Sequence, residues 1–186
     1  MKKTLLIVGI LALVAVVYTW SSYNGLVAAR EAVTAQWQQV ETLYQRRFDL
    51  IPNLVASVKG VLNQEQTVFA DIANARAKYS GAQSVGDKAT AANQVESALS
   101  RLLVIVENYP TLKSSETVRD LMTQLEGSEN RISVERGRFN ESVKTFNTTI
   151  KKFPKNIFAS LFGFDVIEYF EAQTGAENAP KVDLVQ

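Results

Sequence analysis

The sequence predicts an all-α protein in which an N-terminal transmembrane helix continues into an up-down antiparallel four-helix bundle of long helices. A long apolar run stands near the N-terminus, and after it apolar residues recur at alternating spacings of three and four. No window shows the strict alternation of a β-strand. Four such segments joined by short connections are most simply arranged as consecutive antiparallel neighbours.

The first element is the apolar run from Leu5 to Val17, which follows Lys2 and Lys3. Counted over residues 4–20 it has about 17 residues, the short end of what crosses a bilayer as a helix. No good cleavage site follows the run, and the helical pattern continues without a break. We therefore expect an uncleaved anchor over residues 1–22 that meets membrane lipid; the alternative is a cleaved signal peptide. The lysines before the run predict a cytoplasmic N-terminus and a main domain outside the cytoplasm.

The bundle is predicted over residues 23–153, and its first two helices meet near a proline. The first helix is expected to end near Asp49, because Pro52 disfavours a helical conformation at the residue before it. Pro52 also suits the first turn of the next helix. The second helix then ends in the loop predicted by composition over residues 80–87.

The third helix is expected to stop before Pro110, and the fourth to run from Ser114 or Ser115 to Phe153. Residues 154–173 form an aromatic segment, predicted to be membrane-proximal through Phe158, Phe162 and Phe164. Packing against the base of the bundle, or against a neighbouring copy of the chain, is the alternative for these rings. Residues 174–186 are polar and predict a disordered tail.

The amino-acid composition excludes most enzyme classes. The chain has no histidine and no cysteine, which excludes a Ser-His-Asp triad and the usual zinc, haem and iron–sulfur ligand sets. We therefore expect no metal and no cofactor. The formal net charge of +1 gives no bulk attraction to nucleic acid, and no motif identifies a small-molecule substrate. The two-glycine pattern at residues 81–88 has Asp87 where a phosphate loop needs lysine, so nucleotide binding is rejected.

Two polar clusters flank the predicted connections. In an up-down bundle both connections lie at the same end, so we expect Arg46 or Arg47 to pair with Glu107, and asparagines to satisfy free helix-end groups. The clusters are interpreted either as contacts that fix the register of the bundle helices or as a docking surface for a partner. Their members are Arg46, Arg47, Asp49, Pro52 and Asn53 in the first cluster and Glu107, Asn108, Tyr109 and Pro110 in the second.

The predicted fourth helix has a polar band in its apolar stripe, which includes Glu129, Glu135 and Arg136. Such a band commonly specifies register or oligomeric state. Ion pairs along the helix are the main interpretation of its carboxylates. A carboxylate-based hydrolase that uses Glu129 and Glu135 is the alternative from another class of function.

Several segments together resemble the LemA family. They are residues 46–55 (RRFDLIPNLV), residues 107–113 (ENYPTLK), and Leu125-Glu126 followed by Glu129-Asn130-Arg131-Ile132, Arg136 and Phe139-Asn140. The resemblance spans roughly residues 23–170. It implies a bacterial inner- or cell-membrane protein with one span and a helical domain, and it implies no known catalytic activity.

Taken together, these observations favour a non-catalytic, membrane-anchored scaffold of the bacterial envelope that binds other proteins or forms a homo-oligomer through heptad-like seams. The alternative is an accessory subunit of a membrane protease or transporter complex, with a membrane protein as its partner.

Overall fold

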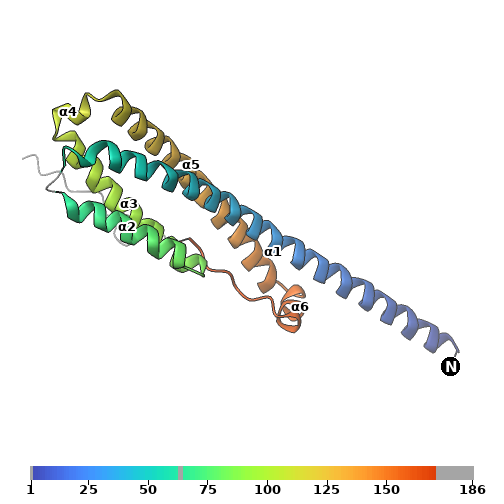
Figure 1. The fold of residues 1–186 in the computed structure, drawn as a ribbon. Helices are drawn as coiled ribbons and strands as arrows, with labels where there is room; N and C mark the ends of the chain where they lie inside the picture. The colour runs from blue at the N-terminus through green and yellow to red at the C-terminus, as the bar shows by residue number, and fades with distance from the viewer. Residues whose placement is uncertain (1, 63–64, 171–186) are drawn as a thin grey trace, which may run out of the picture. The chain divides into compact units, whose positions relative to one another are not determined.

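The structure is a computed structural model that describes residues 2–62 and 65–170, and within these ranges it contains helices and no β-strand (Figure 1). The all-α prediction is confirmed. The predicted tail at residues 174–186 lies outside the described residues. The helices are α1 (Lys2–Lys59), α2 (Gln66–Gly81), α3 (Val85–Glu107), α4 (Pro110–Lys113), α5 (Glu116–Lys151) and α6 (Lys155–Phe162).

The chain divides into two compact units. The first comprises Met1–Glu41 and Val134–Glu168, and the second comprises Thr42–Ser133 and Tyr169–Gln186. Helices α1 and α5 therefore contribute to both units, whereas α2, α3 and α4 lie wholly in the second and α6 lies wholly in the first.

The second unit holds the four-helix arrangement. The last part of α1, then α2, α3 and the first part of α5 follow one another in alternating directions (Figure 1). Aromatic rings fill part of its core: Tyr79 lies 5.3 Å from Tyr44 and 4.8 Å from Phe48 between ring centroids, and Phe170 stacks on Tyr44 at 6.5 Å. Half of the residues that α3 buries are alanines, and these are Ala89, Ala91, Ala92 and Ala98.

Helix α1 does not end near Asp49, so this prediction is wrong. It continues through Pro52 to Lys59. Proline removes one backbone hydrogen bond and costs up to about 3 kcal/mol in a helix interior. Here the apolar stripe continues on both sides of the proline, because Phe48, Ile51 and Leu54 are all buried while Pro52 itself is exposed. Burial of that stripe outweighs the local preference, and the helix instead ends just before Gly60.

The predicted second helix, from Pro52 to the loop at residues 80–87, is divided: its first part belongs to α1, and α2 begins only at Gln66. The remaining predicted ends agree with the structure to within a few residues. Helix α3 stops at Glu107, and Pro110 takes the first position of the short α4. The loop between α2 and α3 is shorter than predicted, since Ser84 already caps α3: its hydroxyl accepts a hydrogen bond from the Asp87 amide at 3.0 Å. Such a cap satisfies one of the free amides at a helix start.

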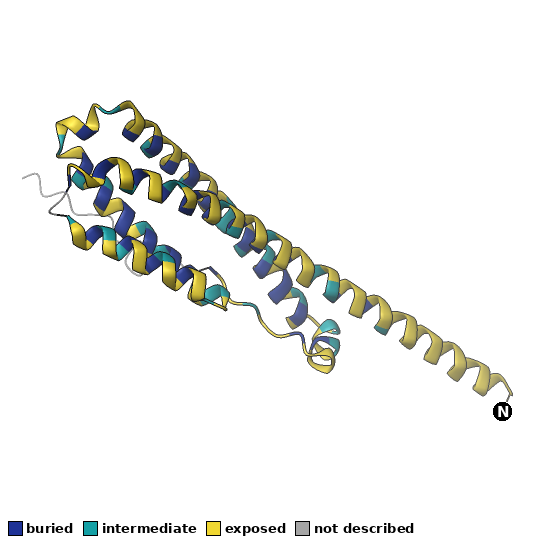
Figure 2. Ribbon diagram, in the orientation of Figure 1, coloured by how far each residue is buried: buried dark blue, intermediate teal, exposed yellow. Residues whose placement is uncertain are grey.

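The first unit packs the early part of α1 against the late part of α5. Trp37 of α1 meets Phe139 of α5 with ring centroids 5.2 Å apart, and Leu26 of α1 and Val143 of α5 are fully buried in this unit. The N-terminal part of α1 differs, because every residue from Lys2 to Tyr18 is exposed (Figure 2). This stretch is long and apolar enough to cross a membrane, and none of its most apolar window is buried.

Candidate functional site

The most buried charge among the described residues belongs to the second unit. Arg47, with 8% of its side chain exposed, forms an ion pair with Glu129, whose side chain is 29% exposed. Arg47 comes from α1 and Glu129 from α5. The sequence predicts both as site residues, but the predicted pairing of Arg46 or Arg47 with Glu107 is wrong. Among the described residues, Glu107 makes no ion pair with either arginine.

The reason for the different pairing is the position of Arg47 on its helix. Because α1 continues through Pro52, Arg47 lies in a helix interior, beside the buried Phe48, and not in a connection at the end of the bundle. Its Nε is buried and has no hydrogen-bond acceptor within the described parts of the chain. Among the residues that the structure describes, only the Nη1 group of Arg47 has a carboxylate partner, so the stability of the buried charge depends strongly on Glu129.

The Glu107–Pro110 segment forms the turn between α3 and α4. Asn108 caps α3, and its side-chain amide donates to the Val104 carbonyl at 3.2 Å, as expected for a group at a helix end. Tyr109 takes the position before α4, and Glu107 is exposed. Helix-end geometry thus accounts for the conformation of this turn and for the hydrogen bond of Asn108.

The remaining predicted residues of the first cluster lie on the surface of α1. Asp49 does not cap a following helix; it accepts a hydrogen bond from Gln45 at 3.0 Å. Asn53 likewise lies inside α1, where its carbonyl accepts from the Ser57 hydroxyl at 2.8 Å. Neither asparagine nor aspartate closes a helix end there, because no helix ends there.

A shallow groove of about 190 Å³ lies beside this surface in the second unit. Arg46 and Arg131 line it, together with Leu43, Leu50, Thr123, Gln124, Gly127 and Ser128. Both arginines are exposed, and neither has an ion-pair partner among the described residues. Guanidinium groups of this kind can bind a carboxylate or phosphate.

The carboxylates proposed for acid–base chemistry are each engaged within their own unit. In the first unit, Gln36 donates to Glu135 at 2.6 Å, and Arg138 forms an ion pair with the same carboxylate at 2.6 Å. Arg136 is half-buried in that unit. In the second unit Glu129 is held by Arg47. This engagement is typical of structural ion pairs.

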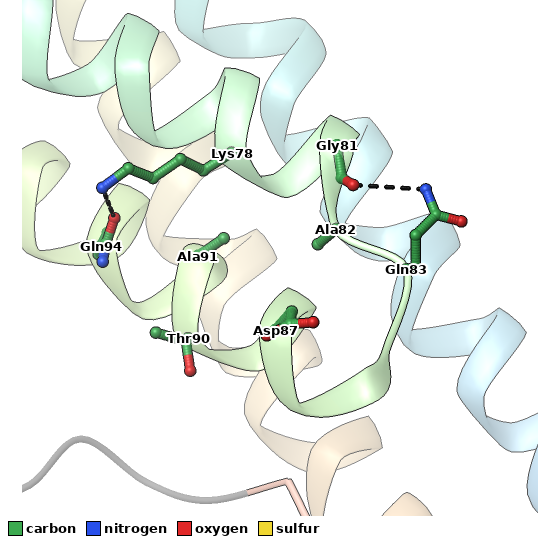
Figure 3. Close-up of a pocket in the computed structure, with 8 residues that line it drawn as sticks. All are labelled: Lys78, Gly81, Ala82, Gln83, Asp87, Thr90, Ala91 and Gln94. Atoms are coloured by element: carbon green, nitrogen blue, oxygen red, sulfur yellow. Dashed lines mark hydrogen bonds between the residues drawn. The ribbon is translucent and has the colours of Figure 1, made fainter.

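A second shallow groove lies on the outer side of α2 and α3 (Figure 3). It has a volume of about 390 Å³ and is lined by Lys78, which donates to Gln94 at 3.1 Å, and by residues around the α2–α3 loop. The loop is no phosphate cradle, since Gly81 ends α2 and the Asp87 carboxylate accepts from the Ser84 hydroxyl at 2.8 Å. No group of three or more acidic residues in the described ranges is arranged to hold a metal.

The predicted membrane-proximal rings pack onto α1 and α5. Phe158 lies 5.8 Å from Tyr18, Phe162 lies 5.0 Å from Tyr23, and the buried Phe164 lies 6.0 Å from Tyr23 and 6.5 Å from Phe146. All belong to the first unit.

Asn147 is a residue that sequence reasoning missed. It is 4% exposed on α5 and makes two hydrogen bonds with one backbone unit: its amide donates to the Ile167 carbonyl at 2.8 Å, and its carbonyl accepts from the Ile167 amide at 2.9 Å. The segment after α6 is thereby fastened to α5. The available signal was an asparagine next to the apolar stripe, beside Phe146.

Comparison with known proteins identifies the family. The chain is 30% identical to the magnetosome protein MamQ of Magnetospirillum gryphiswaldense, over 94% of this chain and 74% of the relative. It is 28% identical to the magnetosome proteins MamQ 1 and MamQ 2 of Paramagnetospirillum magneticum, over 93% of this chain and 74% of each relative. The sequence model of the LemA family matches residues 36–184. The chain therefore belongs to the LemA family.

Proposed function

We propose that this protein is a non-catalytic helical scaffold, anchored in the bacterial inner or cell membrane by a single span and acting through protein–protein contacts. The observation that carries the proposal is the apolar run at the start of α1. It is exposed over its whole length and continues into a helix whose later residues form protein core. A fully exposed apolar surface of this size needs a membrane or a partner to cover it.

Self-association is the second part of the proposal. In the first unit a groove of about 410 Å³ is lined by small side chains of both long helices, among them Ala29, Ala32, Ser142 and Thr145. Small residues allow close approach of another helix. A second copy brought beside the first by a shared membrane supplies such a helix.

Two observations support the proposal that the protein has no catalytic activity. The residue types of most nucleophilic and metal-dependent enzymes are missing from the sequence. The best-placed carboxylates, Glu129 and Glu135, are engaged by Arg47, Arg138 and Gln36. A carboxylate hydrolase is tested by Glu135→Gln, which retains the shape of the side chain and leaves the Arg47–Glu129 ion pair in place. Unchanged folding and an unchanged cell phenotype would exclude this hydrolase, and a lost phenotype in a folded variant would support it.

The principal experiment extracts the full chain from membranes with detergent, measures the mass of the particle and identifies co-eluting proteins. The proposal expects the chain in the membrane fraction and a mass of more than one copy. A matched variant, Leu11→Arg with Val14→Arg, introduces two charges into the apolar run and should release the protein, since each costs about 3 kcal/mol at the centre of a span.

The outcomes separate the candidate functions. A monomer without partners would contradict the scaffold proposal. A stoichiometric membrane enzyme or transporter in the particle would favour an accessory subunit. Recovery of the unaltered chain in the soluble fraction would contradict the anchor itself.

A further inference from the structure

Helix α6 has an apolar face that the protein leaves uncovered. Ala159 is buried on one side, whereas Ile157 and Leu161 are 54% and 71% exposed on another. Phe153, just before the helix, is 81% exposed. These three residues are spaced by four, which places the two helical members on one face. The face differs from the one predicted, since Phe158 points to α1.

The ring contacts of the first unit locate α6 along α1. Phe158 contacts Tyr18 and Phe162 contacts Tyr23, so α6 lies beside the C-terminal end of the exposed apolar run (Figure 1). Trp20, between these tyrosines in the sequence, is 69% exposed. Tyrosine and tryptophan at the end of an apolar span are typical of the membrane–water interface.

The charges at the start of α6, next to the uncovered face, are positive, and the exposed Asp165 is the first acidic residue after the helix. Lys151, Lys152 and Lys155 stand at the end of α5 and the start of α6, and no acidic residue occurs between Ser142 and Phe164. Lysines next to an apolar helix face are attracted to anionic phospholipid. The same cluster disfavours a second copy on this face, because an isologous contact would bring the lysines of both copies together.

We propose that α6 is an interfacial helix: Phe153, Ile157 and Leu161 enter the headgroup–acyl boundary of a bilayer, while the three lysines contact anionic phospholipid headgroups. The inference rests on the proposed membrane anchor, because that anchor brings α6 to the bilayer surface. The protein then meets the membrane at two places. Packing of α6 on Tyr18 and Tyr23 sets the angle at which the first unit leaves the membrane.

The test uses the absence of cysteine from the chain. Single-cysteine variants of the full-length protein, Ile157→Cys and Leu161→Cys, are labelled with a polarity-sensitive fluorophore and reconstituted into phosphatidylcholine–phosphatidylglycerol vesicles. Asn156→Cys is the matched control, since Asn156 is exposed on the same helix and lies about 100° around it from Ile157, away from the apolar face. Leu11→Cys reports on the anchor.

Entry of residues 157 and 161 into the bilayer should shift the emission of their labels to the blue, and brominated acyl chains should quench that emission, with little effect at residue 156. Replacing phosphatidylglycerol by phosphatidylcholine, or Lys151, Lys152 and Lys155 by glutamine, should weaken the quenching. Quenching at residue 11 without quenching at 157 and 161 would overturn the interfacial helix and leave the anchor intact. Loss of quenching at residue 11 would overturn the anchor.

A second copy on this face gives a different result. Labels at residue 161 would then show self-quenching that disappears on dilution with unlabelled protein, without quenching by brominated lipid. That result would overturn the assignment of lipid as the occupant.

Discussion

At the scale of single residues, the second unit should be most sensitive to mutation at the ion pair between Arg47 and Glu129. A buried guanidinium is tolerated only while its carboxylate is present, because desolvation of an unpaired charge is costly. The pair crosses from α1 to α5 within one unit, so it also specifies how these helix segments align.

Glu129→Ala should therefore lower the free energy of unfolding by about 3 kcal/mol, because Arg47 stays buried without its counter-charge. Urea denaturation of the full chain in detergent measures the loss. Glu126→Ala is the control, an exposed carboxylate on the same helix, expected within about 0.5 kcal/mol of the unaltered protein. A double-mutant cycle with Arg47→Ala should show strong coupling, whereas Arg47→Ala with Glu107→Ala should be additive. The reverse pattern would contradict the structure.

Asn147 offers a second residue-level prediction. Asn147→Ala removes both hydrogen bonds to Ile167. The backbone amide of Ile167 should then exchange its hydrogen faster with solvent, because each lost buried bond costs about 1–3 kcal/mol. Hydrogen exchange measured by mass spectrometry should show faster labelling of the 163–168 peptide. Asn147→Asp keeps an acceptor for the Ile167 amide but loses the donor, and an intermediate rate is expected. Equal exchange rates in the unaltered protein and both variants would contradict the role of Asn147 in holding the segment after α6.

At the scale of elements, α1 shows how burial overrides a local signal. Pro52 lacks the amide that would bond to the Phe48 carbonyl, yet the helix continues because Ile51, Leu54 and Val58 stay on the buried stripe. An interruption at Pro52 would break the register of that stripe.

Pro52→Ala should accordingly stabilise the protein, by about 1–3 kcal/mol, since alanine restores the hydrogen bond at an exposed position. The midpoint of urea unfolding measures the effect. Ala56→Gly, one turn later and also exposed, is the opposite control and should destabilise by about 1 kcal/mol. A destabilised Pro52→Ala variant would mean that the proline is required by the local packing.

At the scale of the whole molecule, charge before the apolar run predicts orientation. Lys2 and Lys3 favour a cytoplasmic N-terminus, so the later residues should face the other side. A Ser100→Cys variant should react with a membrane-impermeant maleimide on spheroplasts, because Ser100 is exposed on α3. Labelling only in inverted vesicles would reverse the assignment. Lys2→Glu with Lys3→Glu should reduce the externally labelled fraction.

The sequence alone determined the features that depend on short-range physics. Periodicity determined the helical class, apolar length determined the candidate span, and Pro110 and the residues around Ser84 marked helix ends that the structure confirms. Turn and cap residues act within a few positions, and a periodic stripe repeats its signal many times. The order of several motifs was enough to indicate the LemA family.

Tertiary structure decided what depends on packing between distant segments. Packing keeps α1 helical through Pro52. It pairs Arg47 with Glu129 in place of Glu107, and it brings the Ile167 amide to the Asn147 side chain. Each outcome is a competition between a local preference of a few kcal/mol and burial by residues far along the chain. A sequence shows which residues are charged or apolar, but partners such as Arg47 and Glu129 become neighbours only when the helices between them have folded back.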